Sequence, residues 1–176
     1  IFDRDKIFVS GPSGVGKTTV VKEIMKQCPE LNKTVSVKTR KPRKNEVDGK
    51  DYHFISKDEF YDYQFNSKLL ENNIYNGEHY GTLHSEINKY PTDKPLVLVI
   101  DVSGRRHVLR HFPLSTTIFI QAPSTNELRK RIEHRGENSE DEILERIETA
   151  VKEMEEARYY DYVIVNDDFS DCVKKV

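Results

Sequence analysis

The residues with the clearest chemical signature form a glycine-rich run near the start of the chain. Residues 11–18 read GPSGVGKT, which fits the spacing G-x-x-x-x-G-K-[ST] of a phosphate-binding loop. Glycines let the backbone fold tightly so that successive N–H groups point at phosphate oxygens, and the N-terminus of the following helix adds partial positive charge. Lys17 supplies a positive charge for β- and γ-phosphates, and Thr18 supplies an oxygen for Mg²⁺. An ordinary glycine-rich turn is the alternative, but the strand and helix patterns on either side favour the phosphate loop.

A second candidate is an acidic residue at the end of a strongly apolar run. Residues 96–100 read LVLVI, which is typical of a strand buried on both faces of a parallel sheet, and Asp101 follows at once. A carboxylate there is well placed to help hold Mg²⁺ beside a nucleotide, because a phosphate loop works with a metal ion. The alternative is that Asp101 is a helix cap or a turn residue.

A basic, turn-rich segment contains Arg40 and Arg43 on either side of a proline. Guanidinium groups are planar forks suited to binding phosphate through two hydrogen bonds. A solvated basic run is the plainer interpretation, and a net charge of −2 at pH 7 without a wider basic patch argues against nucleic acid as a partner. Tyr52 and Tyr80 can each donate a hydroxyl to an anion, or serve as ordinary strand packing.

Three arginines, Arg131, Arg135 and Arg146, lie around a glycine-containing break in a helical pattern. Arg131 and Arg135 share one helix face. A segment carrying arginines is able to close over transferring phosphates, exclude water and stabilise developing charge, whereas the alternative is i,i+4 pairing with nearby glutamates. His107 and His111 are also four residues apart, and without a third ligand nearby we expect solvated helix residues rather than a zinc site.

The composition bounds the class of protein. The 176 residues suffice for one domain with a real core and a small inserted subdomain, and 33% charged residues predict a heavily charged surface. The longest apolar run, residues 96–100, is too short to span a bilayer, and the first residues lack the pattern of a signal peptide. Cys28 and Cys172 suggest no disulfide framework, so we expect a reducing, cytosolic setting and no membrane partner. Because the sequence begins at Ile1 rather than Met, and residues 170–176 resemble the start of a helix, we expect further residues at both ends.

Strand and helix patterns alternate along the chain, which predicts an α/β fold with a doubly wound parallel sheet and right-handed crossovers. Capping boxes at 56–59, 124–127 and 139–142 mark three helix starts. The expected strands are residues 7–9, 34–39, 52–55, 96–101, 116–120 and 162–165, and the expected helices are 17–27, 57–66, 85–89, 104–111, 125–134 and one that begins at 139.

Residues 69–80 have a short, mixed pattern punctuated by Gly77 and by Gly81 just after it, so we expect a small, mostly β insertion that carries one helix. We expect one domain, with a core at residues 1–35 and 83–176, an insertion at 36–82 and a helical lid at 131–150. Ligands on doubly wound sheets bind beyond the carboxyl ends of the strands. Residues 11–18, residues 36–43, Asp101 and Asn166 all lie at or just beyond such ends, so they should converge on one crevice.

Together these residues resemble the guanylate kinase family, and the resemblance covers almost the whole chain in order. The acceptor-binding signature, which is more specific than the phosphate loop, is carried by Ser36-x-x-x-Arg40-x-x-Arg43, Glu46-Val47-Asp48-Gly49-Lys50-Asp51-Tyr52-x-Phe54, Glu71, Tyr80-Gly81-Thr82 and Val163-Ile164-Val165-Asn166-Asp167. The resemblance implies a P-loop NTPase-type core with a GMP-binding insertion and a helical lid. It also implies transfer of the γ-phosphoryl group of ATP to GMP, and to dGMP, with Mg²⁺, as in purine nucleotide metabolism; protein partners stay open.

The resemblance also implies roles for individual residues. ATP would be bound by Gly11, Ser13, Gly14, Val15, Gly16, Lys17, Thr18, Thr19 and Asn166. GMP would be bound by Ser36, Arg40, Arg43, Tyr52, Glu71, Tyr80 and Thr82. Thr18 and Asp101 would hold the metal, and Lys17, Arg131, Arg135 and Arg146 would act in catalysis. Glu71 would accept the N1 and N2 hydrogens of guanine, which adenine does not present, so the wrong base would leave a buried carboxylate unpaired.

Three positions depart from the family pattern. Val99 stands where an acid is usual, Ser103 where Gln is common and Lys38 where Thr is common. Two other hypotheses therefore remain beside an active GMP kinase. One is a catalytically weak, guanylate-kinase-like module that binds a phosphorylated peptide, which Val99 favours and the complete Lys17-Thr18 loop opposes. The other is a related small-molecule kinase with a different phosphate acceptor.

Overall fold

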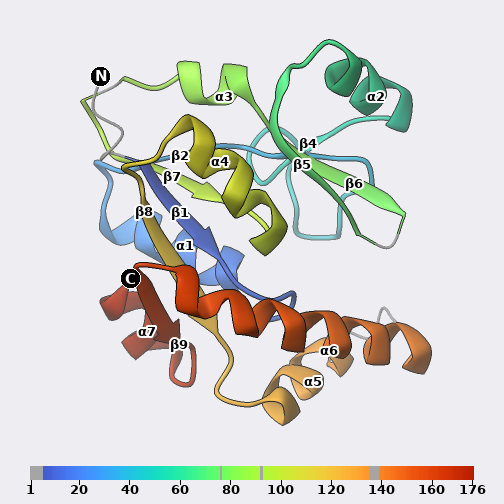
Figure 1. Ribbon diagram of the computed structural model, residues 1–176, viewed down its shortest axis with the longest axis vertical. Helices are drawn as coiled ribbons and strands as arrows, with labels where there is room; N and C mark the ends of the chain where they lie inside the picture. The colour runs from blue at the N-terminus through green and yellow to red at the C-terminus, as the bar shows by residue number, and fades with distance from the viewer. Residues whose placement is uncertain (1–5, 76, 92, 135–138) are drawn as a thin grey trace.

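The computed structural model describes residues 6–75, 77–91, 93–134 and 139–176. Within these ranges, the larger sheet has the strand order β2-β7-β1-β8-β9, and all its paired strands run parallel (Figure 1). Because the paired strands run parallel, the chain must cross over the sheet between one strand and its neighbour. The predicted doubly wound parallel sheet is confirmed. Its strands are β2 (Asn32–Lys33), β7 (Leu96–Val99), β1 (Lys6–Ser10), β8 (Thr116–Gln121) and β9 (Tyr162–Val165).

Both faces of this sheet are covered, because alternate side chains of its apolar strands enter separate clusters. On one face, Val9 and Ile120 pack with buried side chains of four helices. On the other face, Phe8 and Leu98 pack with Val108 of the helix that follows β7. Burial on both sides explains why these strands read as continuous apolar runs. The covering helices are α1 (Lys17–Gln27), α5 (Thr125–Glu133), α6 (Glu140–Glu155) and α7 (Phe169–Lys175) on the first face and α4 (Arg105–His111) on the second.

A smaller mixed sheet lies beside the larger one, at the upper right of Figure 1. Its order is β4-β3-β6-β5, with β3 and β4 parallel and the remaining pairs antiparallel. The expected insertion, mostly β with one helix, is confirmed, while the boundaries given to it stay a prediction. Its elements are β3 (Val37–Lys38), β4 (His53–Phe54), α2 (Lys57–Phe65), β5 (Leu69–Tyr75) and β6 (Glu78–Leu83).

The expected strand at 34–39 is wrong in its extent. In the larger sheet, only Asn32–Lys33 form the strand β2, and the backbone N–H of Thr34 makes a last bond to Val97. The next N–H, that of Val35, donates to the buried carboxylate of Glu86 at 2.9 Å, so the chain leaves the sheet there. It then joins the small sheet as β3. Glu86 lies in α3 (His84–Asn88), so the break depends on a residue far away in the sequence.

Residues 69–80 also differ from expectation, because they form most of a long hairpin, β5 and β6, rather than a short mixed segment. Each of the three predicted capping boxes marks a helix start, but only the one at Ser139 is a complete box. Ser56 and Ser124 each accept from the backbone N–H three residues later at 3.1 Å. Ser139 forms a full capping box with Glu142 at the start of α6. Short 3₁₀ turns, η2 (Val102–Gly104) and η3 (Glu156–Tyr159), complete the connections.

No helix in the described ranges is both long and apolar enough to cross a membrane.

In Figure 1, the small sheet with α2 lies above and α5 with α6 lies below. The carboxyl ends of β1 and β7 open between these two layers, where a cavity of about 620 Å³ is lined by residues of both sheets and of α6.

Candidate active site

The first wall of this cavity is the loop between β1 and α1. Three of its glycines have positive φ, at 147° for Gly11, 88° for Gly14 and 98° for Gly16, which side chains rarely permit. A Cβ atom on Gly11 would lie under 3.0 Å from the carbonyl oxygen of Ile120 in β8. The loop is therefore fitted tightly into the sheet, and the glycine spacing read from the sequence is required by its backbone. Other residues of the loop and of the first turn of α1 also line the cavity: Ser13, Lys17, Thr18 and Thr19.

The ammonium group of Lys17 lies across its own loop. Its Nζ donates to the carbonyl oxygens of Gly11 and of Pro12, the latter at 2.9 Å. These bonds keep a positive charge at the loop mouth, next to the backbone N–H groups at the start of α1. An anion placed there would meet both the lysine and the positive end of the helix.

Asn166 supports the loop between β1 and α1 from within the protein. Its side chain is buried at 6% exposure, and Nδ2 donates to the carbonyl oxygen of Val15 at 2.8 Å. Its backbone N–H donates to Gln121 at the end of β8, also at 2.8 Å. The guanidinium of Arg131 donates to the carbonyl oxygen of Asn166 at 3.0 Å. Asn166 therefore shapes the loop from within the protein, while its expected contact with the adenine of ATP stays a prediction.

The opposite wall is one face of the small sheet, and its register places the polar side chains in two rows. Lys38 pairs with Tyr80, and Tyr80 pairs with Asn73, which gives the first row. Thr82 pairs with Glu71, and Ser36 lies two residues before Lys38 on the same face of the sheet, which gives the second row. Alternation along a strand directs both rows to one side. All but Thr82 of these residues line the cavity.

Glu71 is the most buried acid of this wall, at 6% exposure. The hydroxyl of Thr82 donates to its Oε1 at 2.7 Å, and a Cβ on Gly104 would come 3.0 Å from its Oε2. Burial raises the pKa of Glu71 to about 7, a rise that the bonds from Thr82 oppose and that Asp101 reinforces. A buried carboxylate with acceptor capacity left over is suited to reading paired N–H donors of a ligand.

The basic residues stand at the outer end of the same wall. Arg40 makes a two-pronged ion pair with Glu46, with both N–O distances at 2.6 Å, and the backbone N–H of Arg43 donates to the same carboxylate at 2.8 Å. These bonds to Glu46 raise the pKa of Arg40. Glu46 thus fixes the direction of one arginine and the backbone of the other, and both line the cavity.

Tyr52 connects the two walls. Its hydroxyl lies 3.5 Å from Oγ1 of Thr18, the residue after the phosphate-loop lysine. The residues predicted for donor and acceptor are therefore brought together: Lys17 and Thr18 share one cavity with Arg40, Arg43, Tyr52, Glu71 and Tyr80. Residues of the phosphate loop, residues of the segment 36–43 and Asp101 thus converge on one crevice as predicted, whereas Asn166 is not among the residues that line it.

Asp101 lies at the floor of the cavity, just beyond β7, where the sequence placed it. Nδ2 of Asn73 donates to its Oδ2 at 3.4 Å, and its backbone begins η2. Val99, two residues earlier, also lines the cavity. Thr18 and Asp101 present the hydroxyl and carboxylate oxygens that a hard cation takes as ligands.

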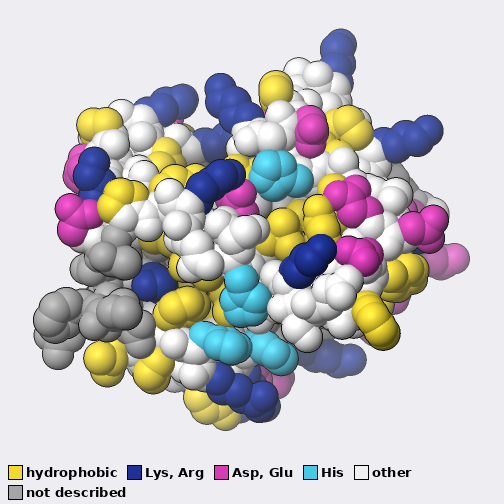
Figure 2. Space-filling model, turned by 90° about the horizontal axis from the view of Figure 1, so that it is seen from above, with side chains coloured by type: hydrophobic (Ala, Val, Ile, Leu, Met, Phe, Trp, Pro, Cys, Tyr) yellow, Lys and Arg dark blue, Asp and Glu magenta, His cyan; other side chains and the backbone are white. Residues whose placement is uncertain are grey.

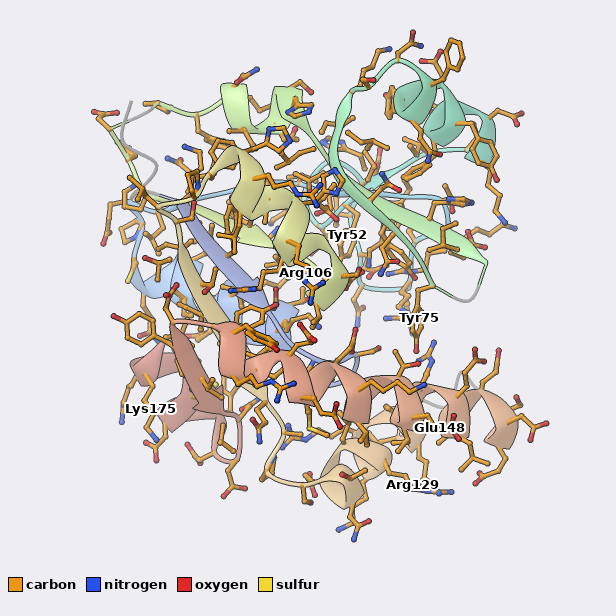
Figure 3. All side chains as sticks on the ribbon, viewed as in Figure 1. Tyr52, Tyr75, Arg106, Arg129, Glu148 and Lys175 are labelled. Carbon is orange, nitrogen blue, oxygen red and sulfur yellow. The ribbon has the colours of Figure 1, made fainter. Side chains whose placement is uncertain are left out.

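The arginines of the expected lid divide between two environments. Arg146 of α6 lines the cavity, and its guanidinium lies 5.2 Å from the ring centroid of Tyr75 in the hairpin. Figure 3 shows Tyr75 reaching down from the hairpin towards α6, whereas Arg129 lies beside α5, below α6. Arg131 instead binds Glu127 at 3.3 Å, in addition to Asn166, so the i,i+4 pairing considered for it is present. Arg135 lies outside the described residues.

Several residues that line the cavity were not identified as site residues from the sequence, among them Lys38, Asn73 and Glu153. Burial raises the pKa of Glu153 to about 7, although the nearby charge of Lys17 opposes the rise. Glu153 shares a face of α6 with Arg146 seven residues earlier, so helical spacing from Arg146 could have indicated it. Lys38 was noted only as a departure from the family pattern, and Asn73 lies in the segment whose pattern was mixed.

Histidines gather on another face of the molecule, seen from above in Figure 2. The ring of His111 lies 5.7 Å from that of His84 and 6.5 Å from that of His107. His84 is thus a third imidazole that sequence spacing did not reveal. Even so, among the residues that the structure describes, no group of three His, Cys, Asp or Glu side chains is arranged to hold a metal ion.

Comparison with known proteins gives consistent relatives over nearly the whole chain. A sequence profile described as guanylate kinase matches residues 3–176. The guanylate kinase of Geobacter metallireducens is 43% identical over 169 residues, which cover 96% of this chain and 83% of the relative. That of Trichormus variabilis is 39% identical over 171 residues, which cover 97% and 86%.

Comparison with solved structures also finds a guanylate kinase. The crystal structure of guanylate kinase from Anaplasma phagocytophilum superposes with a TM-score of 0.77 at 29% identity, over 96% of this chain and 80% of that one. A gluconokinase from Sinorhizobium meliloti, at 15% identity and a TM-score of 0.55 over 99% and 90% of the two chains, shares the fold alone.

Proposed function

Because the chain belongs to the guanylate kinase family, we propose that its crevice transfers the γ-phosphoryl group of ATP to GMP, and to dGMP, giving ADP and GDP or dGDP. The observation that carries this proposal is the one shared cavity that Lys17, Arg40 and Glu71 all line. Phosphoryl transfer requires donor and acceptor phosphates in line, and two anion-binding walls on one crevice meet that need.

We assign the phosphates of ATP to the loop between β1 and α1. Lys17 now donates to two carbonyl oxygens of the loop, and a bound triphosphate offers it negatively charged acceptors instead. The positive φ angles of the glycines support N–H groups turned towards the ligand. The residues proposed to bind ATP are those predicted from the resemblance: Gly11, Ser13, Gly14, Val15, Gly16, Lys17, Thr18, Thr19 and Asn166.

We assign guanine to Glu71, with Thr82 and Ser36 beside it. The carboxylate retains acceptor capacity after its 2.7 Å bond from Thr82, so it can take both N1–H and N2–H of the base. The phosphate of GMP then reaches Arg40, Arg43, Tyr52 and Tyr80. Adenine offers no such donor pair, which makes the buried acid the selective element.

The residues at the floor of the crevice fit a magnesium ion. Thr18 and Asp101 supply hard oxygen ligands, and Mg²⁺ commonly takes one or two protein groups together with phosphates and water. We therefore assign the metal to these two residues. When bound, the ion would supply positive charge that offsets the negative charge of the phosphates.

The rest of catalysis consists of positioning the substrates and neutralising their charge with the lysine and arginine side chains of the protein. Lys17 and Arg146 already line the cavity, while Arg131 and Arg135 are proposed to act with them on the developing charge. The two unpaired cysteines, Cys28 and Cys172, support the expected reducing, cytosolic setting.

The test is a coupled assay of ADP formation with ATP, Mg²⁺ and a panel of nucleoside monophosphates. We expect turnover of GMP and dGMP and little with AMP, CMP or UMP. Turnover of a different acceptor in place of GMP would establish the related-kinase hypothesis. Absence of turnover, combined with competition between a phosphopeptide and GMP, would establish the binding-module hypothesis, which the apolar Val99 favours.

A further inference from the structure

Lys38 occupies the middle of the acceptor wall, yet none of the roles above uses it. Its Nζ lies 3.6 Å from the ring centroid of Tyr52 and 4.8 Å from that of Tyr80. The register of β3 and β6 places it directly opposite Tyr80, and it lines the crevice. The ammonium group is thus held between the two tyrosines assigned to the acceptor phosphate, an attraction typical of a cation over aromatic rings.

The surroundings of Lys38 leave its charge without a matched anion. Arg40 and Arg43 repel it, and the carboxylate of Glu46 is already held by Arg40 through two bonds of 2.6 Å. Asp101 attracts it from the floor of the crevice. Within the described part of the chain, Lys38 forms no ion pair with a carboxylate. Burial therefore lowers the pKa of Lys38 to about 7, an effect that Arg40 reinforces and Glu46 and Asp101 oppose.

The position of Lys38 along the strands indicates what it meets. Ser36, Thr82 and Glu71 form the row assigned to guanine, and Lys38 and Tyr80 form the next row. Two residues of strand separate these rows, which is about 6.6 Å. Arg40 follows two residues further along the chain. A nucleotide whose base lies against Glu71 therefore extends its ribose and phosphate over the row of Lys38 and towards Arg40.

We propose that Lys38 is a third cationic ligand of the acceptor phosphate, beside Arg40 and Arg43, and so a determinant of acceptor affinity that depends on the ligand's charge. This inference rests on the proposed function, since it takes GMP as the acceptor. Bound phosphate supplies the anion that the free pocket lacks, and the tyrosine rings hold the ammonium in place to receive it. Lys38 acts on binding and not on the choice of base, because Glu71 and Thr82 lie in the other row.

The test compares neutral and charged substitutions by calorimetric titration with GMP and with guanosine, which lacks the phosphate. We expect Lys38→Met and Lys38→Gln to weaken GMP binding by about tenfold or more, the effect of losing one charge-assisted hydrogen bond. Lys38→Arg should stay within about threefold of the unmodified chain, because it keeps the charge. The affinity for guanosine should be the same in the unmodified chain and in all three Lys38 variants.

A matched control is available in Lys68, whose Nζ also lies over a tyrosine ring, 5.2 Å from the centroid of Tyr63, but beside α2. Lys68→Met should leave GMP affinity unchanged. Thermal unfolding of each variant checks that the fold is kept. The neutral substitutions remove a half-buried charge that forms no ion pair with any carboxylate that the structure describes, so we expect no loss of stability at pH 7.

Two outcomes would overturn the inference: unchanged GMP affinity in both neutral variants, or equal weakening of GMP and guanosine, which would place Lys38 on the base or in the fold. Failure of the unmodified chain to bind GMP would instead remove the proposed function. Inorganic phosphate then serves as the probe, and Lys38 retains its role only if Lys38→Met binds phosphate more weakly than the unmodified chain does.

Discussion

Replacement of Glu71 by Gln should raise the free energy of unfolding of the protein and weaken its binding of GMP. Gln has nearly the shape of Glu and keeps an oxygen to accept the 2.7 Å bond from Thr82. It removes the negative charge from a site that is 6% exposed. If Glu71 served the packing of the fold, its substitution would lower the free energy of unfolding. If Glu71 serves a ligand, removing its buried charge raises the free energy of unfolding.

The size of the gain follows from the pKa of Glu71, which burial raises from 4.5 to about 7. Because the folded state holds the proton more tightly, the stability that Glu71 contributes is complete below its unfolded pKa and is lost as pH rises through 7. This difference corresponds to about 3 kcal/mol above pH 7. We therefore expect Glu71→Gln to raise the free energy of unfolding by about 3 kcal/mol at pH 8 and by under about 1 kcal/mol at pH 5.

The same substitution places an N–H donor where guanine presents its own donors. Losing one hydrogen bond to a charged group in a buried site should cost about 2–3 kcal/mol of binding, which is about 30- to 150-fold in affinity. Urea unfolding of the ligand-free chain at pH 5 and pH 8, with calorimetric titration of GMP at pH 8, measures both effects. A variant that is no more stable than the unmodified chain at pH 8, or that binds GMP equally well, would refute the reasoning.

Three other predictions concern the two walls. Lys17→Ala should reduce turnover at least about 10³-fold, because the charge that meets the transferring phosphate is lost, while GMP binding measured by titration stays within about threefold; equal loss of both would contradict the division into two walls. GMP affinity should be highest near pH 7, since Glu71 must be ionised and Lys38 protonated, and both have a pKa of about 7 in the free chain. Titrations from pH 5.5 to 9 check this, with Lys38→Met expected to lose the alkaline decline and Glu71→Gln the acid one, and a flat profile would count against it. Gly11→Ala should destabilise the fold by about 2 kcal/mol or more, because its Cβ would overlap the backbone of Ile120 at a φ of 147°; an unfolding midpoint like that of the unmodified chain would contradict this.

The phosphate loop could be predicted in detail because its information is local. The glycine spacing, the preceding β1 and the helix starting at Lys17 lie next to one another in the sequence, and the positive φ angles occur at the glycines of the motif. The strands of the larger sheet were recognisable for a related reason, since burial on both faces leaves an apolar run. Asp101 was found by its place at the end of such a run.

The acceptor wall was less accessible to sequence reasoning because it depends on pairings between distant strands. Glu71 was indicated by the family resemblance alone, since nothing in residues 69–80 predicted the hairpin that places it opposite Thr82. The wrong extent of the strand at 34–39 has a similar cause, because the capture of Val35 by Glu86 leaves no trace in the local pattern. Lys38 and Asn73 acquire their place in the site only through that register.

The arginines of the expected lid show the same limit of sequence reasoning. The sequence grouped Arg131 with Arg146 because both lie around the glycine-containing break, but tertiary contacts separate them. Arg131 binds the carbonyl oxygen of Asn166, and Arg146 faces the hairpin. Helical periodicity records which residues share a face, and it does not record what that face meets.

The most direct test of two anion-binding walls on one crevice is the binding of a bisubstrate compound, adenosine joined to guanosine through a 5′,5′-polyphosphate chain. We expect it to bind at least about 10²-fold more tightly than ATP or GMP alone, because the second contact is made at high effective concentration. Either nucleotide should displace it, and both Lys17→Ala and Glu71→Gln should weaken it. An affinity no greater than that of the better single nucleotide, or displacement by only one of the two, would contradict a shared crevice.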